Sequence, residues 1–153
     1  MNIEASSRLL RIGMIGCGEI AVQNAKAVHE APNATIAAVA DVNEAVAQDL
    51  AGRYNAPYHT ATEELLARDD VDAVVISVPH FLHAPLAIQA AQAGKHVIVE
   101  KPMATTLAEA EQMLAAANAA GVQLATLYCQ RYLPYVQRAK SLIDQGALGR
   151  VQS

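Results

Sequence analysis

Six residues near the start of the chain have the types and the spacing that could hold a phosphate group. They are Gly16, Cys17, Gly18, Glu19, Ile20 and Ala21. Gly16 permits a backbone angle that other residues resist, and Gly18 lacks the side chain that would keep a pyrophosphate away. The free N–H groups and the dipole at the start of a following helix attract phosphates. The stretch predicts a dinucleotide-binding turn, although the same pattern also occurs in tight turns that bind nothing.

A carboxylate follows the next apolar run of the chain. Residues 35–40 are expected as a buried strand, and Asp41 comes directly after it, twenty residues beyond Ala21. At this distance the dinucleotide fingerprint has an acid that hydrogen-bonds the adenosine ribose hydroxyls and repels a 2′-phosphate. Asp41 could instead cap a helix that begins near Asn43. The combination with the glycines favours the ribose role, and with it NAD over NADP.

Apolar runs and amphipathic stretches alternate along the chain and predict the elements that position these residues. Without a repeat or a linker, this alternation is typical of an α/β fold with a doubly wound parallel sheet, the Rossmann fold. Right-handed crossovers predict the strand order 3-2-1-4-5-6. Strands are expected over 9–15, 35–40, 57–58, 73–77, 95–99 and 122–127, and helices over 19–31, 43–54, 60–66, 82–93, 106–121 and 131–146.

Local signals indicate where two of these helices begin and how one of them packs. Thr60 with Glu63, and Thr106 with Glu109, match the pattern of a capping box. On the second of these helices one side is apolar and is expected to face the sheet. That side consists of Leu107, Ala110, Leu114 and Ala117.

The predicted strand order brings distant segments of the chain together. The loops after strands one, two, four and five open at the same edge of such a sheet. The glycine turn, Asp41, residues 79–83 and Lys101 are therefore expected in one cleft. The whole chain, 1–153, is expected as one dinucleotide-binding domain, with a core sheet over about 9–127 and a closing helix over 131–146.

Composition excludes several classes of function. The 153 residues have a formal charge of −4, which gives no basic surface for nucleic acid, and no apolar run is long enough to cross a membrane. The residues after Arg8 and Arg11 are interrupted by glycines and do not form the apolar region of a signal peptide. A cytoplasmic location is therefore expected. Cys17 and Cys129 lie far apart and outside any metal-binding spacing, so each is expected as a reduced packing residue and no metal site is predicted.

From residue 93 to Pro102 the chain has a run that ends in Glu100, Lys101 and Pro102. With residues 16–21, 77–83 and 131–149, this run resembles the N-terminal half of the glucose-fructose oxidoreductase and inositol dehydrogenase family, Gfo/Idh/MocA. The resemblance implies binding of NAD or NADP and hydride transfer to or from a sugar, polyol or related hydroxylated substrate. It places Lys101 beside the nicotinamide and the substrate, as the catalytic residue, with Glu100 positioning it or contacting the carboxamide.

The resemblance also implies roles for the loop after the fourth strand. Val78, Pro79 and His80 would line the cofactor, but Val78 and His80 replace the usual Thr and Asn, so His80 could be a substitute donor or merely exposed. His83 matches the histidine of the family and is expected to be more structural than catalytic. Arg131 could reach the cofactor or substrate, or form a surface ion pair.

One departure from the family concerns the end of the chain. In the family a second domain, with substrate contacts and a catalytic Asp and His pair, begins just after the position of residues 148–151. The 153 residues do not include such a domain, so the chain alone is expected to be catalytically incomplete. Two alternatives remain: a stand-alone dinucleotide-binding sensor or partner module without hydride transfer, and a remnant without a ligand that forms a homo-oligomer.

Overall fold

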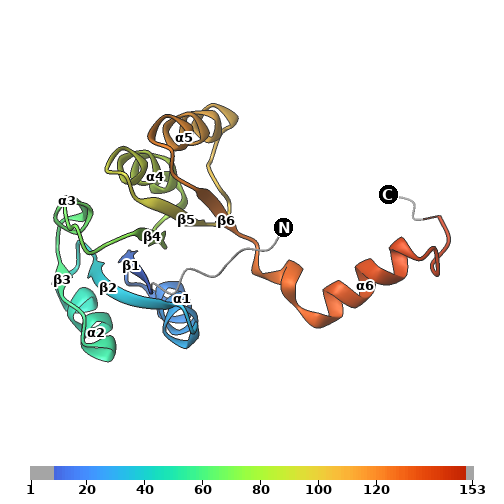
Figure 1. Ribbon diagram of the computed structural model, residues 1–153, viewed down its shortest axis with the longest axis horizontal. Coiled ribbons are helices and arrows are strands. Elements are labelled where there is room, and N and C mark those ends of the chain that lie inside the picture. Colours follow the sequence, from blue (N-terminus) through green and yellow to red (C-terminus); the bar gives the residue numbers. More distant parts are fainter. Residues whose placement is uncertain (1–8, 151–153) are drawn as a thin grey trace.

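The computed structural model describes residues 9–150, which contain one parallel sheet of six strands (Figure 1). Its strand order is β3-β2-β1-β4-β5-β6, which confirms the predicted order. Residues 1–8 and 151–153 of the expected domain lie outside the described residues. The strands are β1 (Leu10–Ile15), β2 (Ala34–Ala40), β3 (Tyr58–His59), β4 (Ala73–Ile76), β5 (His96–Glu100) and β6 (Leu124–Leu127).

Helices cover both faces of the sheet, because its central strands are apolar on both sides. Helices α1 and α2 lie on one face, and α3, α4 and α5 lie on the other (Figure 1). None of the helices within residues 9–150 is long and apolar enough to cross a membrane. The helices are α1 (Glu19–Glu30), α2 (Glu44–Tyr54), α3 (Thr62–Leu66), α4 (His83–Gln92), α5 (Leu107–Ala120) and α6 (Pro134–Asp144), with the short 3-10 helices η1 (His80–Leu82) and η2 (Cys129–Tyr132).

Two apolar clusters fill the space between the sheet and its helices. On one face, α1 presents the fully buried side chains of Ala21 and Ala25 to a cluster that includes Met14 and Val39. Alanine at these positions lets the helix approach the strands closely. The other cluster joins β4 and β5 to α3, α4 and α5. The close approach of α1 matters for the site, because it brings polar side chains of α1 within reach of the strand ends.

The start of helix α3 differs from the prediction. The helix follows Ala61 and has no side-chain cap, so Thr60 and Glu63 do not form the expected capping box. Ala61 is extended, with φ −118° and ψ 131°, so the helix begins at Thr62, one residue later than a helix capped by Thr60 would. The Glu63 carboxylate instead accepts a hydrogen bond from Gln89 Nε2 at 2.9 Å, which links α3 to α4. The capping box expected at the start of α5 is confirmed.

The inward face of α5 was predicted correctly at Ala117 and wrongly at its two leucines. Leu107 and Leu114, which were expected to face the sheet, are exposed, and the buried residues of α5 are Met113 and Ala117. The helix packs mainly against α4 instead of directly on the strands. Its inward side is therefore set by the position of α4, which the apolar pattern of α5 alone does not reveal.

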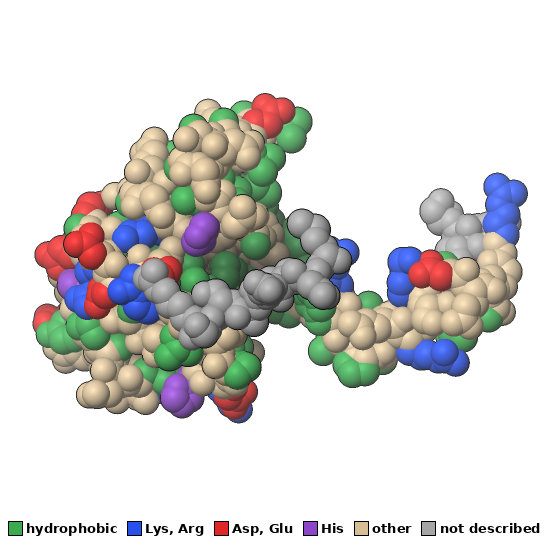
Figure 2. Space-filling model, viewed as in Figure 1, with side chains coloured by type: hydrophobic (Ala, Val, Ile, Leu, Met, Phe, Trp, Pro, Cys, Tyr) green, Lys and Arg blue, Asp and Glu red, His purple; other side chains and the backbone are tan. Residues whose placement is uncertain are grey.

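The last helix, α6, projects away from the rest of the molecule (Figures 1 and 2). It was expected as a closing helix, yet it has no buried residue and does not cover the sheet. Hydrophobic side chains gather at the base of this arm (Figure 2), where Tyr128, Tyr132 and Tyr135 are exposed. The apolar surface of the arm is thus left without cover in the described chain.

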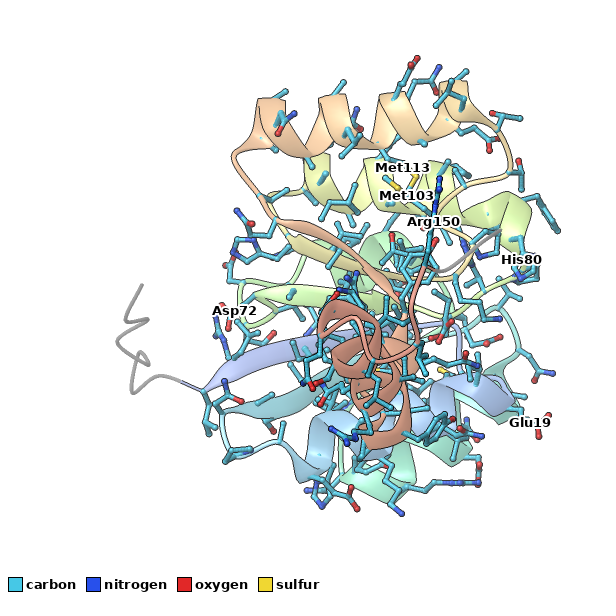
Figure 3. All side chains as sticks on the ribbon, turned by 90° about the vertical axis from the view of Figure 1, so that its right-hand side faces the viewer. Glu19, Asp72, His80, Met103, Met113 and Arg150 are labelled. Atoms are coloured by element: carbon cyan, nitrogen blue, oxygen red, sulfur yellow. The ribbon has the colours of Figure 1, made fainter. Side chains whose placement is uncertain are left out.

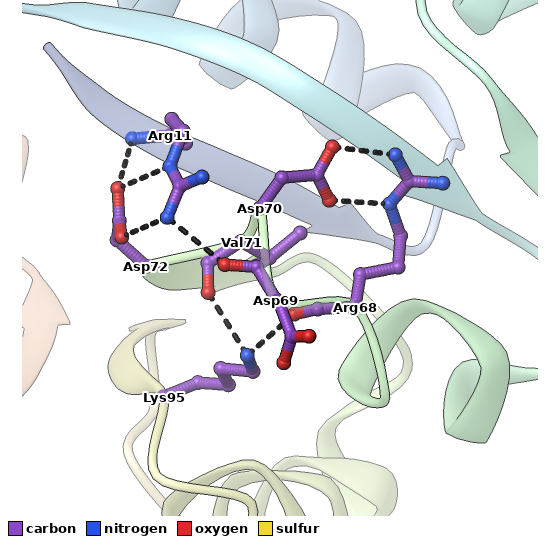
Figure 4. A network of polar contacts seen from close by, with 7 residues as sticks. All are labelled: Arg11, Arg68, Asp69, Asp70, Val71, Asp72 and Lys95. Atoms are coloured by element: carbon purple, nitrogen blue, oxygen red, sulfur yellow. Dashed lines mark hydrogen bonds and ion pairs between the residues drawn. The ribbon is translucent and has the colours of Figure 1, made fainter.

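Ionic contacts join the segments at the amino ends of the strands (Figure 4). Arg11 donates to both carboxylate oxygens of Asp72, with an Nη2–Oδ1 distance of 2.7 Å, and this hydrogen bond raises the pKa of Arg11 above its ordinary value. Arg68 forms a similar two-point contact with Asp70 and lowers the pKa of that carboxyl. Lys95 Nζ donates to the carbonyl oxygens of Arg68 and Val71 at 2.7 and 3.0 Å. These contacts fix the segment that leads into β4.

Replacing Lys95 by methionine is expected to lower the free energy of unfolding by about 1 to 2 kcal/mol, because two backbone carbonyls lose a charged donor. The matched control is Lys26→Met, since Lys26 is exposed and forms a looser contact with Glu30, at 3.7 Å. This control is expected to change stability by less than about 0.5 kcal/mol. Urea denaturation of both variants measures the difference. Equal losses in the two would contradict a structural role for the Lys95 contacts.

Candidate functional site

The carboxyl ends of β1, β2, β4 and β5 meet at one edge of the sheet, here called the carboxyl edge. Figure 3 shows Glu19 and His80 at this edge and Asp72 at the opposite one. The loops at the carboxyl edge are in direct contact. A Cβ atom added to Gly16 would lie 2.4 Å from the carbonyl oxygen of Ser77, the residue that follows β4. The predicted convergence of loops is therefore present.

The glycine turn has the geometry of an anion site. Gly16 has a φ of +84°, in the left-handed region, and its N–H donates to the carbonyl oxygen of Ala40 at 2.8 Å. Gly18 precedes α1 and has no side chain to cap the N–H groups of the first helical turn, which begins with Glu19 and Ile20. Open space surrounds the position that a Gly18 side chain would take. Uncapped N–H groups at the positive end of a helix can bind a phosphate.

Asp41 supports the glycine turn directly. Its Oδ2 accepts a hydrogen bond from the N–H of Cys17 at 2.8 Å, and its Oδ1 accepts one from the N–H of Asn43 at 2.8 Å. The cap of α2 is Asn43, whose Oδ1 accepts from the N–H groups of Ala45 and Val46, so Asp41 is not the cap. The carboxylate thus lies between the turn and the end of β2.

The loop after β4 contains one exposed and one buried histidine. Val78 packs partly against the core, and after Pro79 the chain enters η1 with His80 exposed at the carboxyl edge. His83 is fully buried, and its ring nitrogens lie 2.7 Å from the carbonyl oxygen of Pro102 and 3.0 Å from that of Val78. Both ring nitrogens of His83 therefore contact backbone carbonyl oxygens, and the ring joins the loops after β4 and β5.

A second polar bridge joins α1 to the same two strand ends. The Nδ2 atom of Asn24 donates to Ser77 Oγ at 3.0 Å and to Glu100 Oε1 at 3.1 Å. The other carboxylate oxygen of Glu100 accepts from the N–H of Lys101 at 3.1 Å. Glu100 is only 8% exposed, whereas Lys101, the next residue, is exposed. The bridge therefore places a lysine side chain in solvent directly after a buried, hydrogen-bonded carboxylate.

A pocket of about 690 Å³ opens beside this bridge. Four of the predicted site residues line it, namely Ile20, Glu100, Lys101 and Arg131. Gly16, Gly18 and Asp41 lie along the carboxyl edge outside the lining of the pocket. A ligand that extends from the glycine turn to the pocket would pass uncapped N–H groups first and the cations Lys101 and Arg131 afterwards. The pocket is also lined by Gln23, Asn24, Leu127, Tyr128, Cys129, Gln130 and Val136.

The two cysteines differ in their surroundings. Cys17 is buried, and burial together with the charge of Asp41 raises the pKa of its thiol from 9.0 to about 12, while Cys129 is exposed. Cys17 fits the expected packing role, whereas Cys129 does not, because it lies on the pocket wall. Only the thiolate reacts with alkylating reagents. The two thiols should therefore react at very different rates.

At pH 8, iodoacetamide is expected to modify Cys129 at least about 100-fold faster than Cys17, because Cys17 is buried and stays protonated. The unfolded Cys17 thiol ionises near pH 9 and the folded one near 12, so stability is expected to fall as the pH rises above about 9. Mass spectrometry of peptides from timed reactions measures both rates. Comparable rates in the folded protein would contradict the burial of Cys17.

Sequence reasoning missed Asn24 and the pocket position of Cys129. Asparagine is unfavourable in the interior of a helix, where its side chain competes for backbone hydrogen bonds. Asn24 lies in the interior of α1, between the buried Ala21 and Ala25. That combination is a signal from which a polar contact with the sheet could have been predicted. No comparable signal marks Cys129, because its place depends on the path of the chain after β6.

Comparisons with known proteins agree with this geometry. The model of an oxidoreductase family with an NAD-binding Rossmann fold, GFO_IDH_MocA, matches residues 10–128. A dTDP-3,4-didehydro-2,6-dideoxy-alpha-D-glucose 3-reductase of Actinomadura kijaniata is 33% identical over 154 residues, which cover 100% of this chain and 46% of that protein. The chain thus spans about half the length of this relative.

Two solved structures have the same fold. The WlbA dehydrogenase of Bordetella pertussis, in complex with NADH and UDP-GlcNAcA, matches with a TM-score of 0.89 and 34% identity over 95% of this chain and 42% of its own. The 3-ketoreductase KijD10 of Actinomadura kijaniata, in complex with NADP and TDP-benzene, matches with a TM-score of 0.86 and 33% identity over 91% of this chain and 43% of its own. The chain belongs to the Gfo/Idh/MocA oxidoreductase family, and residues 10–128 are its NAD-binding Rossmann-fold domain.

Proposed function

We propose that the carboxyl edge binds a nicotinamide dinucleotide, NAD in preference to NADP, across the glycine turn and the adjoining pocket. The observation that carries this proposal is the contact between four loops at one edge, with uncapped helix N–H groups at one end and Lys101 at the other. The relatives are about twice as long as this chain, and their remaining length could supply a substrate-binding part. Together with such a part, the domain would transfer hydride to or from a sugar, polyol or related hydroxylated substrate.

The pyrophosphate would bind at the glycine turn. Gly16 and Gly18 would let it approach the backbone, and the N–H groups of Glu19 and Ile20 would donate to it. Asp41 would accept hydrogen bonds from the adenosine ribose, since a carboxylate already held by two N–H groups can accept further donors.

The nicotinamide would enter the pocket and supply the hydride chemistry when bound. Val78, Pro79 and His80 would lie beside the nicotinamide. The buried ring of His83 would hold their loop in place through its contact with the carbonyl oxygen of Val78. The ammonium group of Lys101 would stabilise negative charge that develops on the oxygen of the substrate. Glu100 would orient Lys101 through the main chain, and Arg131 would contribute a second cation at the pocket wall.

Calorimetric titration with NADH and NADPH tests the cofactor proposal. NADH is expected to bind with a dissociation constant in the micromolar range, roughly −8 kcal/mol, and NADPH about tenfold more weakly or worse, because Asp41 repels a 2′-phosphate. In the Asp41→Asn variant the two affinities should approach each other, since the charge is removed. A folded sample that binds neither nucleotide would overturn the proposal, and equal affinities in the unmodified chain would overturn the preference for NAD.

We also propose a cytoplasmic location, because an exposed free thiol such as Cys129 is suited to a reducing compartment. Self-association through the apolar base of the α6 arm is a further proposal, supported by the exposed Tyr132 and Tyr135. Sedimentation at increasing protein concentration would test the second. A monomer at every concentration would contradict it.

A further inference from the structure

We infer that Asn24 is a positioning residue that holds Lys101 in place through Glu100. The inference rests on the proposed function only in the role that it gives to Lys101. It starts from the hydrogen bonds that join α1 to the ends of β4 and β5. Asn24 itself would contact no reacting atom.

The carboxylate of Glu100 is buried and lies between Asn24 and the main chain of Lys101. Burying a carboxylate is unfavourable unless its oxygens accept hydrogen bonds. Among residues 9–150 Glu100 forms no ion pair, and its oxygens accept one bond each, from Asn24 Nδ2 and from the N–H of Lys101. Removing the Asn24 donor would leave Oε1 without its partner. Glu100 could then turn toward solvent, and the Lys101 N–H would lose the acceptor that orients it.

The position of Asn24 in α1 fits this role. It lies near the middle of the helix, where asparagine is less favourable than most residues. The neighbouring Ala21 and Ala25 are fully buried, which brings the helix close enough for a short amide side chain to reach two strands. The same amide also donates to Ser77 Oγ, so the orientation of Asn24 is fixed by two acceptors.

Lys101 is held on its other side as well. The carbonyl oxygen of the next residue, Pro102, lies 2.7 Å from a ring nitrogen of the buried His83. Both neighbours of Lys101 are thus anchored, one to α1 and one to α4, while the Lys101 side chain stays exposed. This arrangement restricts the main chain at Lys101 and lets the ammonium group reach a ligand in the pocket.

The variant that tests the inference most sharply is Asn24→Asp, which keeps the size of the side chain but replaces the donating amide by a carboxylate next to Glu100. Like charges at this distance repel. Asn24→Ala removes the donor without adding charge. Glu30→Ala is the matched control, because Glu30 lies in the same helix with an exposed side chain far from the bridge. Circular dichroism and thermal melting would establish that each variant is folded.

The first measurement is hydrogen exchange of the Lys101 amide by NMR. Asn24→Asp is expected to speed this exchange at least about tenfold relative to the unmodified chain, while the amide of Val97, within the sheet, stays unchanged. Glu30→Ala should change neither. If the Lys101 amide exchanged at the same rate in Asn24→Asp and in the unmodified chain, the positioning role would be overturned, whatever the protein binds.

The second measurement compares NADH with ADP-ribose, which lacks the nicotinamide. In Asn24→Asp the affinity for NADH is expected to fall about tenfold, with ADP-ribose unchanged within about twofold. In the Glu100→Ala background, which lacks the Glu100 acceptor of the Asn24 amide, the Asn24→Ala substitution should have little further effect if it acts through Glu100. Full additivity would instead indicate a direct contact with the ligand and overturn the inference. An unmodified chain that binds neither nucleotide would refute the proposed function, and the exchange result would still decide the role of Asn24.

Discussion

The Gly16→Ala variant is expected to lower the free energy of unfolding by about 3 kcal/mol or more, which is a large part of the stability of a domain of this size. The added Cβ would lie 2.4 Å from the carbonyl oxygen and 2.8 Å from the carbonyl carbon of Ser77. These are backbone atoms of the residue that follows β4, and they cannot rotate away as a side chain can. Alanine also disfavours the φ of +84° that the turn requires.

Chemical denaturation measures this loss, and Gly52→Ala provides a control. Gly52 lies within α2, and a Cβ added there would meet no atom within 4 Å. Its replacement is expected to raise helix stability by up to about 1 kcal/mol. A Gly16→Ala protein as stable as the unmodified chain would show that the turn can relax. The close contact between the first and fourth loops would then not be a requirement of the fold.

The Gly18→Ala variant is expected to fold normally and to lose about 100-fold in affinity for NADH, or about 2.7 kcal/mol. Gly18 has an ordinary backbone conformation, with φ −69° and ψ −171°, and an added Cβ would meet no protein atom. The methyl group would instead occupy the space through which a pyrophosphate approaches the backbone. Stability should stay within about 0.5 kcal/mol of the unmodified chain.

Titration calorimetry and urea denaturation on the same sample separate the two properties. The two glycine variants are expected to differ in the property that they change. Gly16→Ala should lower the stability of the fold, and Gly18→Ala should lower only the affinity for NADH. Unchanged NADH affinity in Gly18→Ala would place the pyrophosphate elsewhere and would contradict the proposed site.

Most of the fold could be predicted because its signals are local. The strands β1, β4 and β5 are short apolar runs followed by turn residues, and the crossover rule converts their sequence into a spatial order. The capping box at Thr60 failed because Ala61 is extended and the helix starts one residue later than the pattern predicts. The buried side of α5 was decided by contact with α4. The path of α6 likewise depends on surfaces outside its own sequence.

The sequence predicted which loops form the site, but it did not predict the hydrogen bonds between them. The pattern of glycines, Asp41 and Lys101 places these residues at one edge, since parallel strands end there together. The sequence does not reveal that Asp41 accepts the Cys17 N–H, or that Asn24 reaches Glu100, because both bonds depend on how closely loops and helices approach. His83 was expected to be structural, and its buried ring with two carbonyl neighbours agrees with that expectation.

A titration of the ¹⁵N-labelled chain with NADH, followed by amide NMR signals, tests the central claim most directly. We expect the signals of Cys17, Ile20 and Lys101, at the carboxyl edge, to shift with added NADH. The signals of Arg11 and Lys95, at the opposite edge, should stay in place. Shifts confined to the opposite edge, or none at all in a folded sample, would contradict the assignment of this edge as the cofactor site.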